Sequence, residues 1–377
     1  MHIAFLTNEY PPLPTGGIGT SIRNLARALV VQGHQITILG WGPPGDFEDQ
    51  GVHIHMLGAT GVPKLGWLLN RQRAQQELNR LVRREGLAIV EAPDWCGPSA
   101  GMRLECPLVI RCHGSATYFA DLLHEPVRSS VYWAERLALR QATSVGAVSR
   151  FTATVTSQLF RLDNPVRVIP NGIDIRQFQP APVGAQATDT ILYFGTLVRK
   201  KGLLDLCTVF PQILEHYPQA RLRLVGRDSA DQRTGAPSTW ELCRQLLAPE
   251  ALNRVEYIGP RPYGEVQEYV QHAAVCVFPS YAEALPLSWL EAMACAKTVI
   301  AYDIGWAPEI INSGVNGLLI ARGALPELAQ SIVGILADAD RNRALGTAAR
   351  QTVEQLFSAP VVATATLDWY RQVLAAC

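Results

Sequence analysis

The chain has 377 residues, of which 48% are hydrophobic and 18% are charged, so it can bury a sizeable core and is not globally disordered. At roughly 150 residues per domain, this length predicts two domains. The 33 basic and 33 acidic side chains give a formal net charge of zero. This balance argues against a dedicated nucleic-acid-binding protein, because such proteins carry a basic excess.

Eight cysteines are scattered along the chain without a Cys-x-x-Cys pair. This pattern is typical of small core residues in a reducing compartment, and not of a disulfide framework or a zinc site. The first residues, MHIAFLTNEYPP, lack the basic start, long apolar stretch and cleavage site of a secretory signal. No stretch approaches the roughly 18 uninterrupted apolar residues of a membrane span. We therefore expect a soluble cytoplasmic protein that, at most, binds at the inner face of a membrane.

Short apolar runs alternate with longer segments of helical period, which indicates parallel sheets covered by helices. Between the first two runs, Ile22, Leu25, Ala26, Leu29 and Val30 follow the spacing of one buried helix face. Continuous apolar strands without polar alternation fit a sheet that is covered on both faces. The strands expected in the first half are 2–7, 35–39, 87–91, 107–111, 143–148 and 166–169.

Residues 176–190 form the best candidate linker, with two prolines, small residues and no helical period. After the linker the pattern starts again, with strands expected at 190–195, 221–225, 255–258, 274–278, 298–302 and 317–320. The predicted fold class is therefore α/β, with two doubly wound Rossmann-like domains. We place an N-terminal domain at 1–180 and a second domain at 181–357, while the helical segment 358–377 could pack back on the first.

In doubly wound sheets, ligands bind outside the carboxyl ends of the strands. Two such domains facing each other would form a cleft, and we expect the chemistry of the protein there.

The most informative stretch is 276–311, CVFPSYAEALPLSWLEAMACAKTVIAYDIGWAPEII. A buried strand is followed by a loop that carries Glu283, and Pro286 suits the first turn of a helix, where its missing N–H costs nothing. The free N–H groups and the positive dipole end of such a helix favour a phosphate. Glu291 lies about one turn inside this helix, where a carboxylate can hold the hydroxyls of a ribose.

In isolation, Glu283 and Glu291 would be interpreted as solvated charges at a helix end. The stretch, however, resembles the signature block of retaining glycosyltransferases of family 4, which have the GT-B fold and a Glu-x7-Glu hallmark. The resemblance implies that Glu283 contacts the donor sugar and that Glu291 binds the nucleotide ribose. It also implies that backbone N–H groups of the intervening loop, at Ala284, Leu285 and Leu287, face the sugar and the phosphates.

The block departs from the common family pattern at two positions. Ala296 stands where glycine is frequent, and Thr298 stands where proline is frequent. Both lie past the ligand-facing end of the block, so we expect these departures to affect packing only.

A second candidate element is 191–202, ILYFGTLVRKKG, a strand that runs into a loop before a helix. Two of the four lysines of the chain, Lys200 and Lys201, adjoin at this turn, where a compact ammonium can neutralise a departing diphosphate. In the family, an Arg just after the first glycine and a Lys before the next glycine hold this diphosphate. Lys201 fits the second role, but Thr196 occupies the first position, so Arg199 is the nearest substitute. The alternative is a solvated basic turn.

The first strand–helix turn, NEYPPLPTGGIGTS at 8–21, contains Gly16 and Gly17, which permit tight turning and close approach of a ligand. Its spacing is not Gly-x-Gly-x-x-Gly, and a plain loop before a helix is the alternative interpretation. The turn resembles the amino-terminal glycine loop of the family, which lies near the diphosphate and the acceptor.

His113, in VIRCHGS, directly follows a buried strand, at the start of a loop that is expected to face a ligand. Members of the family place a histidine here beside the donor sugar, while a structural histidine is the alternative. Downstream, 147–152 and 169–174 also match recurrent family segments. Within the second of these, Asn171, Gly172 and Asp174 fit turn formers better than catalysts.

Two other signals are discounted. Asp338 and Asp340 spell the Asp-x-Asp that holds a metal in another glycosyltransferase fold, but they lie between two helical stretches, where aspartate is typical of a helix cap. We therefore expect no metal and no cofactor besides the nucleotide-sugar co-substrate. Segment 64–84 carries six basic residues and one acidic residue, with Trp67, Leu68 and Leu69 near its start. It could rest on an anionic membrane that carries a lipid acceptor, although a solvated helix face is the simpler interpretation.

The resemblance spans nearly the whole chain. It implies transfer of a hexosyl group from a nucleotide-diphosphate sugar to a glycan, lipid or small-molecule acceptor, with the anomeric configuration retained. It also implies that the domain at 1–180 lies on the acceptor side and that the domain at 181–357 binds the nucleotide sugar. His113, Lys201 and Glu283 are the expected catalytic residues. The alternatives are a nucleotide-sugar epimerase or a phosphorylase of the same fold, and a catalytically silent nucleotide-sugar-binding protein. The last alternative is prompted by Thr196 in place of the family's Arg.

Overall fold

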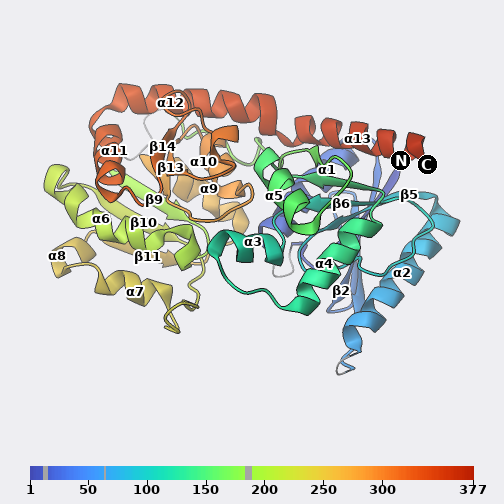
Figure 1. Cartoon of the computed structure of the whole chain (residues 1–377). Coiled ribbons are helices and arrows are strands. Elements are labelled where there is room, and N and C mark those ends of the chain that lie inside the picture. The colour runs from blue at the N-terminus through green and yellow to red at the C-terminus, as the bar shows by residue number, and fades with distance from the viewer. Residues whose placement is uncertain (12–15, 63–64, 183–188) are drawn as a thin grey trace. The chain divides into compact units, whose positions relative to one another are not determined.

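The computed structural model describes residues 1–11, 16–62, 65–182 and 189–377 (Figure 1). The chain divides into two compact units, each of which is described by itself. Unit 1 comprises Met1–Gly172 and Ala359–Cys377, and unit 2 comprises Ile173–Ser358. Part of the predicted linker, 183–188, lies outside the described residues.

The first boundary lies at Gly172, earlier than the predicted position 180. The reason is that the chain joins unit 2 at once: Ile173 forms a β-bridge with Ser358 and donates its N–H to the carbonyl oxygen of Phe357. The carbonyl oxygen of Phe178 then accepts a hydrogen bond from the Arg350 guanidinium at 2.7 Å. Residues 173–180 therefore belong to unit 2.

Unit 1 contains an 8-stranded sheet in the order β3-β4-β2-β1-β5-β6-β7-β8. Edge strand β3 pairs antiparallel with β4, and the other neighbouring strands pair in parallel. The strands are β1 (His2–Leu6), β2 (Gln35–Gly42), β3 (Gly45–Asp49), β4 (Val52–Gly58), β5 (Leu87–Pro93), β6 (Leu108–Cys112), β7 (Ser144–Ala147) and β8 (Arg167–Val168).

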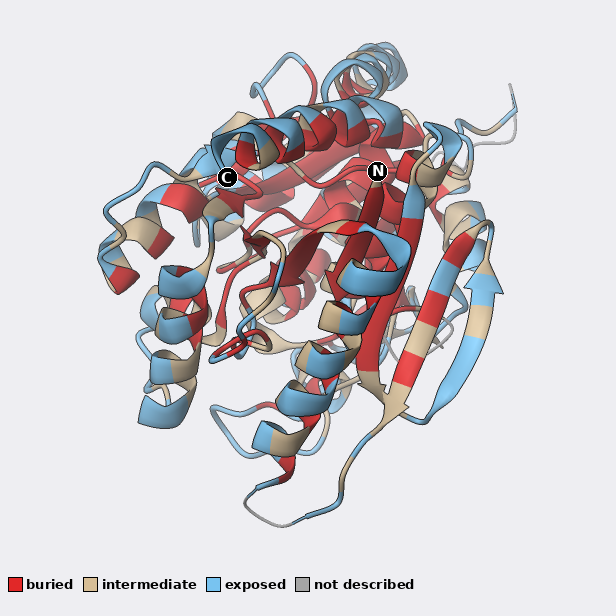
Figure 2. Cartoon of the chain, turned by 90° about the vertical axis from the view of Figure 1, so that its right-hand side faces the viewer, coloured by how far each residue is buried: buried red, intermediate tan, exposed pale blue. Residues whose placement is uncertain are grey.

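The strands predicted for this half are present with shifted ends, but β3 and β4 were not predicted. Sequence GDFED makes β3 polar and mostly exposed at the sheet edge (Figure 2). In β4, buried residues alternate with His53 and His55, so this strand lacks the continuous apolar run used to find the others.

Helices cover both faces of the sheet in unit 1. They are α1 (Gly17–Val31), α2 (Gly66–Glu85), α3 (Ala116–Leu123), α4 (Ser129–Gln141), α5 (Arg150–Phe160) and α13 (Ala359–Ala376). Because successive residues of a strand point to opposite faces, Ile3 and Phe5 pack in one core cluster with residues of α1 and α13, whereas Ala4 and Leu6 pack in another with residues of α2. The predicted buried face of α1 is confirmed except at Val30, which is half-buried.

Unit 2 contains a 6-stranded parallel sheet in the order β11-β10-β9-β12-β13-β14. Its strands are β9 (Thr190–Phe194), β10 (Arg221–Val225), β11 (Val255–Gly259), β12 (Val275–Phe278), β13 (Thr298–Asp303) and β14 (Leu318–Ala321). Every strand predicted in the second half is present. The predicted fold class, α/β with two Rossmann-like parallel-sheet domains, is confirmed.

The α-helices of unit 2 are α6 (Leu203–His216), α7 (Thr239–Gln245), α8 (Pro249–Leu252), α9 (Tyr263–Gln271), α10 (Leu287–Ala294), α11 (Leu325–Ala337) and α12 (Ala339–Thr352). Two short 3-10 turns occur at η1 (Arg199–Lys201) and η2 (Ala307–Glu309), and a π-helical turn, η3 (Val353–Phe357), follows α12. Within the described residues, none of the helices is long and apolar enough to cross a membrane.

Candidate active site

In unit 2, the predicted signature segment runs from strand β12 into helix α10. Pro286 has extended backbone angles and occupies the N-cap of α10, one residue before the position that the sequence suggested. The first helical N–H groups therefore belong to Leu287 and its successors. Residues on all sides of α10 are buried, which anchors the start of this short helix firmly in unit 2.

The two predicted donor motifs meet at the carboxyl ends of β9 and β12. Lys201, in the 3-10 turn after β9, places its Nζ 3.3 Å from Glu283 Oε1. The backbone joins the two loops as well, because the Tyr281 N–H donates to the carbonyl oxygen of Lys200 at 2.8 Å. Both Lys201 and Glu283 are partly buried, so this ion pair is shielded from bulk water.

Gly202 makes this approach of the two loops possible. Its φ is +70°, and a Cβ at this position would lie 1.7 Å from the carbonyl oxygen of Pro279. Only glycine leaves room for the loop after β9 to contact the loop after β12 in this way.

A second set of contacts anchors the signature loop on α6. Asp205 Oδ2 accepts hydrogen bonds from the hydroxyls of Tyr281 and Tyr302, at 2.5 and 2.7 Å. Burial and the Asp205 hydrogen bond raise the pKa of Tyr281 to about 12 and also raise the pKa of Tyr302, so both tyrosines stay neutral donors at physiological pH. This bridge holds the segment that leads to Glu283.

The second glutamate of the pair, Glu291, is buried inside α10 with 5% of its surface exposed. Its Oε1 accepts a hydrogen bond from the Tyr263 hydroxyl at 2.8 Å. Tyr263 begins α9, and its ring packs edge-on against Phe178. Tyr263 was missed from the sequence, because nothing in the local pattern of α9 reveals a contact with a helix that begins more than twenty residues later.

The predicted substitute Arg199 is bound to a different loop. Its Nε and a terminal nitrogen donate to the two oxygens of Asp231 at 2.8 and 2.7 Å, and Thr234 also donates to Asp231. The Arg199 hydrogen bond, followed by those of Thr234, holds the pKa of Asp231 far below its usual value. The structure thus places Arg199 against the loop after β10, and its predicted contact with a diphosphate stays a prediction.

In unit 1, His113 lies directly after β6 and is partly buried. Burial, reinforced by the nearby Arg111 guanidinium, lowers the pKa of His113 to about 3, and a side-chain hydrogen bond with Asn171 opposes this shift. The imidazole is therefore neutral at physiological pH. It can exchange hydrogen bonds with a hydroxyl but brings no positive charge to a phosphate.

Two buried carboxylates that the sequence analysis did not single out shape the loop around His113. Asp94 Oδ1 accepts the His113 N–H at 2.9 Å, and burial raises the Asp94 pKa to about 7. Glu135, from α4, accepts the N–H groups of Cys96, Ala116 and Thr117 and so caps the start of α3. An acidic residue just past a predicted buried strand is the signal that could have identified Asp94.

The predicted glycine loop leads into α1. Gly16 is the N-cap of α1 and donates its N–H to a carboxylate oxygen of Glu9 at 3.0 Å, while Gly17 is the first helical residue. Residues 12–15 of this loop lie outside the described residues. From the same helix, Ser21 donates to Asn171 Oδ1 at 2.8 Å. Helix α1 thereby contacts the segment that also hydrogen-bonds to His113.

Of the two aspartates of the Asp-x-Asp sequence, Asp338 is the helix cap that the sequence suggests, and Asp340 lies in the first turn of α12. Asp338 caps α12 by accepting the Arg341 N–H at 2.9 Å, and Asp340 forms an exposed ion pair with Arg343. In the parts of the chain that the structure describes, no cluster of three or more His, Cys, Asp or Glu side chains is arranged to hold a metal.

Two family models together cover most of the chain. The model of Glycosyltransferase Family 4 matches residues 15–177, and the model of Glycosyl transferases group 1 matches residues 176–352. The chain belongs to glycosyltransferase family 4. The predicted family and its nucleotide-sugar-dependent hexosyltransferase chemistry are thereby confirmed, and the acceptor is undefined.

Two relatives of this family 4 enzyme match over nearly their full length. It is 28% identical to the alpha-maltose-1-phosphate synthase of Mycolicibacterium smegmatis, over 100% of both chains. It is 25% identical to the glycogen synthase of Mycobacterium tuberculosis, over 98% of this chain and 94% of that one.

Solved structures share the fold. A sucrose-phosphate synthase from Thermosynechococcus elongatus matches with a TM-score of 0.81 and 23% identity, over 100% of both chains. HepE from Anabaena matches with a TM-score of 0.77 and 21% identity, over 99% of this chain and 100% of that one. These likenesses identify the fold as GT-B.

Proposed function

We propose that the protein is a retaining hexosyltransferase whose nucleoside-diphosphate sugar is held by unit 2. The observation that carries this proposal is the ion pair between Lys201 and Glu283. Glu283 lies on the same segment as Glu291, whose carboxylate is buried. Such a donor requires a cation for its diphosphate, an acceptor of hydrogen bonds for its sugar hydroxyls and another for its ribose hydroxyls. These three side chains supply one group for each need.

The costly event in the reaction is departure of the nucleoside diphosphate while the sugar develops oxocarbenium-like charge. Without donor, the Lys201 ammonium neutralises Glu283. In the proposed complex the diphosphate competes with Glu283 for this ammonium. The ammonium then stabilises the negative charge that builds on the leaving oxygen. The backbone N–H groups at Ala284, Leu285 and Leu287 complete the proposed cradle, since the start of α10 carries the positive end of a helix dipole.

His113 has a more limited proposed role. Because its imidazole is neutral, it orients a hydroxyl of the donor sugar through one hydrogen bond and does not neutralise the diphosphate. Its contact with the sugar, like that of Gly16 and Gly17 with the diphosphate or acceptor, stays a prediction from the family resemblance.

For the donor we propose a glucose nucleotide. HepE from Anabaena has been solved with UDP and glucose and with UDP-glucose, and the relatives named above are synthases of glucose-containing products. Thermal stabilisation by UDP-, ADP- and GDP-glucose, followed by slow hydrolysis of whichever one binds, tests this choice. Release of nucleoside diphosphate also separates an enzyme from a catalytically silent binding protein. The cytoplasmic location stays a prediction from the sequence.

Two substitutions test the assigned roles. We expect Glu291→Ala to weaken nucleotide binding by about 10- to 100-fold, because a hydrogen bond to a charged group contributes about 1.5–3 kcal/mol. We expect Lys201→Ala to lower kcat by about 100-fold or more with a smaller effect on affinity, because its charge is needed most as the diphosphate leaves. Calorimetric titration with the nucleotide and donor hydrolysis measure the two effects.

Glu250→Ala, an exposed acid at the start of α8, is the matched control for both measurements. If the Glu291 and Lys201 variants keep the affinity and turnover of this control, the assignment of the donor site is wrong.

A further inference from the structure

Three tryptophans of unit 1 are unusually exposed. The exposed fractions are 58% for Trp67, 41% for Trp95 and 60% for Trp133. By contrast, Trp289 and Trp306 in unit 2 are each 1% exposed. A single exposed apolar side chain needs no explanation, but a group of large ones marks an interaction site.

Contacts within unit 1 join the three tryptophans into one region. The Arg71 guanidinium lies 5.1 Å from the Trp67 ring centroid and donates to the carbonyl oxygen of Gly97 at 2.7 Å. Gly97 follows Trp95 in the same loop, and a Cβ at Gly97 would lie 2.5 Å from the carbonyl oxygen of Ala134. The loop of Trp95 therefore contacts both α2, near Trp67, and α4, next to Trp133.

The two helices repeat the same arrangement of side chains. Arg136 lies 5.4 Å from the ring centroid of Trp133, as Arg71 lies over Trp67 one turn along α2. Exposed leucines flank both pairs. We call this region the tryptophan surface, and its members are Leu65, Trp67, Leu68, Arg71, Trp95, Trp133, Arg136 and Leu137.

The charged members of the tryptophan surface, Arg71 and Arg136, are both positive. Over its first three turns α2 contains Arg71 and Arg73 and no acidic residue. The acidic residue of α4, Glu135, is fully buried, whereas Arg140 on that helix is exposed. The acidic residues of α2 lie in its second half, where Glu77 is paired with Arg80.

We propose that the tryptophan surface binds to an anionic lipid bilayer. Tryptophan concentrates at the boundary between lipid headgroups and acyl chains, where leucines such as Leu65 and Leu68 can bury their side chains. Anionic headgroups match the arginines in charge. A soluble glycan could stack on the tryptophan rings, but it would leave the exposed leucines in water. Binding to lipid goes beyond the proposed transferase reaction and needs neither donor nor acceptor.

Flotation of the full-length protein with lipid vesicles tests this proposal. We expect binding to vesicles of equal parts phosphatidylcholine and phosphatidylglycerol, little binding to phosphatidylcholine alone, and release at high salt. The double variant Trp67→Ala/Trp133→Ala should lower the partition coefficient at least tenfold. Each of Arg136→Gln and Arg140→Gln should lower it about fivefold.

Matched controls come from exposed residues of unit 2. Leu246→Ala and Leu356→Ala remove exposed leucines, and Arg343→Gln removes an exposed arginine, so these variants should bind vesicles like the unmodified protein. All variants should keep their melting temperature and donor hydrolysis, because none of the substituted residues belongs to the proposed donor site. A lost transferase reaction with intact vesicle binding would therefore count against the proposed function and not against this proposal.

Three outcomes would overturn the proposal. The first is no binding to phosphatidylglycerol vesicles, and the second is vesicle binding that the tryptophan variants leave unchanged. The third is quenching of tryptophan fluorescence by a neutral oligosaccharide that is lost in the double variant, without vesicle binding. That last result would assign the surface to a glycan.

Discussion

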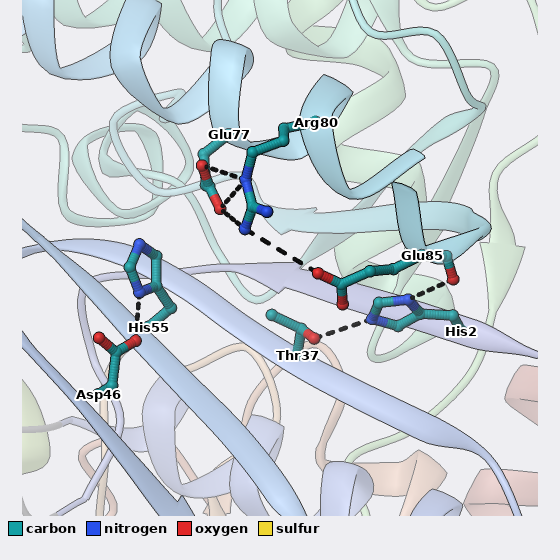
Figure 3. Close-up of polar contacts among 7 residues, drawn as sticks. All are labelled: His2, Thr37, Asp46, His55, Glu77, Arg80 and Glu85. Atoms are coloured by element: carbon teal, nitrogen blue, oxygen red, sulfur yellow. Dashed lines mark hydrogen bonds and ion pairs between the residues drawn. The ribbon is translucent and has the colours of Figure 1, made fainter. Parts of the chain in front are cut away.

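Buried His2 connects the first strand of unit 1 with its neighbours. Its Nδ1 donates to the carbonyl oxygen of Glu85 at 3.3 Å, which leaves Nε2 to accept the Thr37 hydroxyl at 2.8 Å (Figure 3). Burial lowers the His2 pKa below its ordinary value of 6.5, and the imidazole is neutral in the folded protein. Protonation would make Nε2 a donor, so the Thr37 hydroxyl would have to turn and accept a hydrogen bond from it.

This arrangement predicts a loss of stability in acid. Because the folded-state pKa of His2 is lowered, its contribution to stability is fully present above pH 6.5 and decreases as the pH falls below that value. We expect the melting temperature of His2→Gln to depend less on pH below 6.5 than that of the unmodified protein. Arg343→Gln, which removes the exposed ion pair with Asp340, is the control and should leave the pH dependence in this range nearly unchanged. Parallel pH curves for His2→Gln and the unmodified protein would contradict this prediction.

Ala296, which stands where the family frequently has glycine, has an unfavourable backbone conformation. It follows α10 with a φ of +55°, in the left-handed region that an L-residue adopts at a penalty. We predicted that this departure affects packing only, but the structure shows a strained backbone at the position where the family frequently has glycine.

We expect Ala296→Gly to raise the free energy of unfolding by about 1 kcal/mol, because glycine adopts this conformation without the Cβ clash. Ala294→Gly, two residues earlier and inside α10, is the matched control and should destabilise unit 2, because it removes a buried methyl group and loosens a helix. Urea denaturation of both variants measures whether each substitution raises or lowers the free energy of unfolding. A destabilised Ala296→Gly protein would show that the positive φ is not the dominant cost.

At the scale of elements, the proposed donor site depends on contact between two loops that leave neighbouring strands. Strands β9 and β12 pair directly, which places the turn of Lys201 beside the segment of Glu283. Parallel strands present their carboxyl ends at one edge of a sheet, so residues distant in sequence can meet there.

Gly202→Ala tests this contact without changing any residue assigned to the donor. A Cβ at position 202 would overlap the carbonyl oxygen of Pro279, so the two loops must separate and the Lys201 ammonium must move away from Glu283. We expect donor hydrolysis to fall by about 100-fold, as for loss of a catalytic cation. Gly235→Ala, at a comparably positive φ but with open space around its Cβ, controls for backbone strain and should keep activity. Equal activities of the two variants would refute the structural argument.

At the scale of the whole molecule, the two ends of the chain belong to the same unit. Helix α13 packs on α1, and its Tyr370 hydroxyl donates to the buried Glu91 carboxylate at 2.7 Å. Glu91 also pairs with Arg111, whose guanidinium donates to Thr366 at 3.1 Å. Burial and the neighbouring Glu91 charge raise the Tyr370 pKa, which keeps this hydroxyl a neutral donor.

We therefore expect removal of residues 359–377 to affect the two units differently. Unit 1 would lose a helix that covers its core and leave the buried Glu91–Arg111 pair without two hydrogen-bond partners, whereas unit 2 would keep all its elements. Hydrogen exchange should show loss of protection in β1, β5 and β6 with protection retained in β9 and β12. Arg371→Gln, which breaks an exposed ion pair on α13, is the control. Equal loss of protection in both units would contradict the prediction.

The sequence by itself determined the fold class, the Rossmann-like strands and the family. The strands could be predicted because a strand covered on both faces has no polar position and gives a continuous apolar run. The family could be predicted because Glu283 and Glu291 lie within one short segment, whose spacing can be read directly. The polar edge strand β3 and the alternating strand β4 were not predicted, because neither is buried on both faces and neither has a continuous apolar run.

Only the tertiary structure decided which side chains meet. The pairs Lys201–Glu283, Tyr263–Glu291 and Arg199–Asp231 join residues on different elements, and no local period encodes such contacts. The structure also decided that His113 is neutral, because the pKa of a histidine depends on burial and on charges that other strands bring near. Hydrophobic patterning specifies the strands. The strand order within the sheet decides which loops are neighbours, and therefore which side chains meet at the carboxyl ends of the strands.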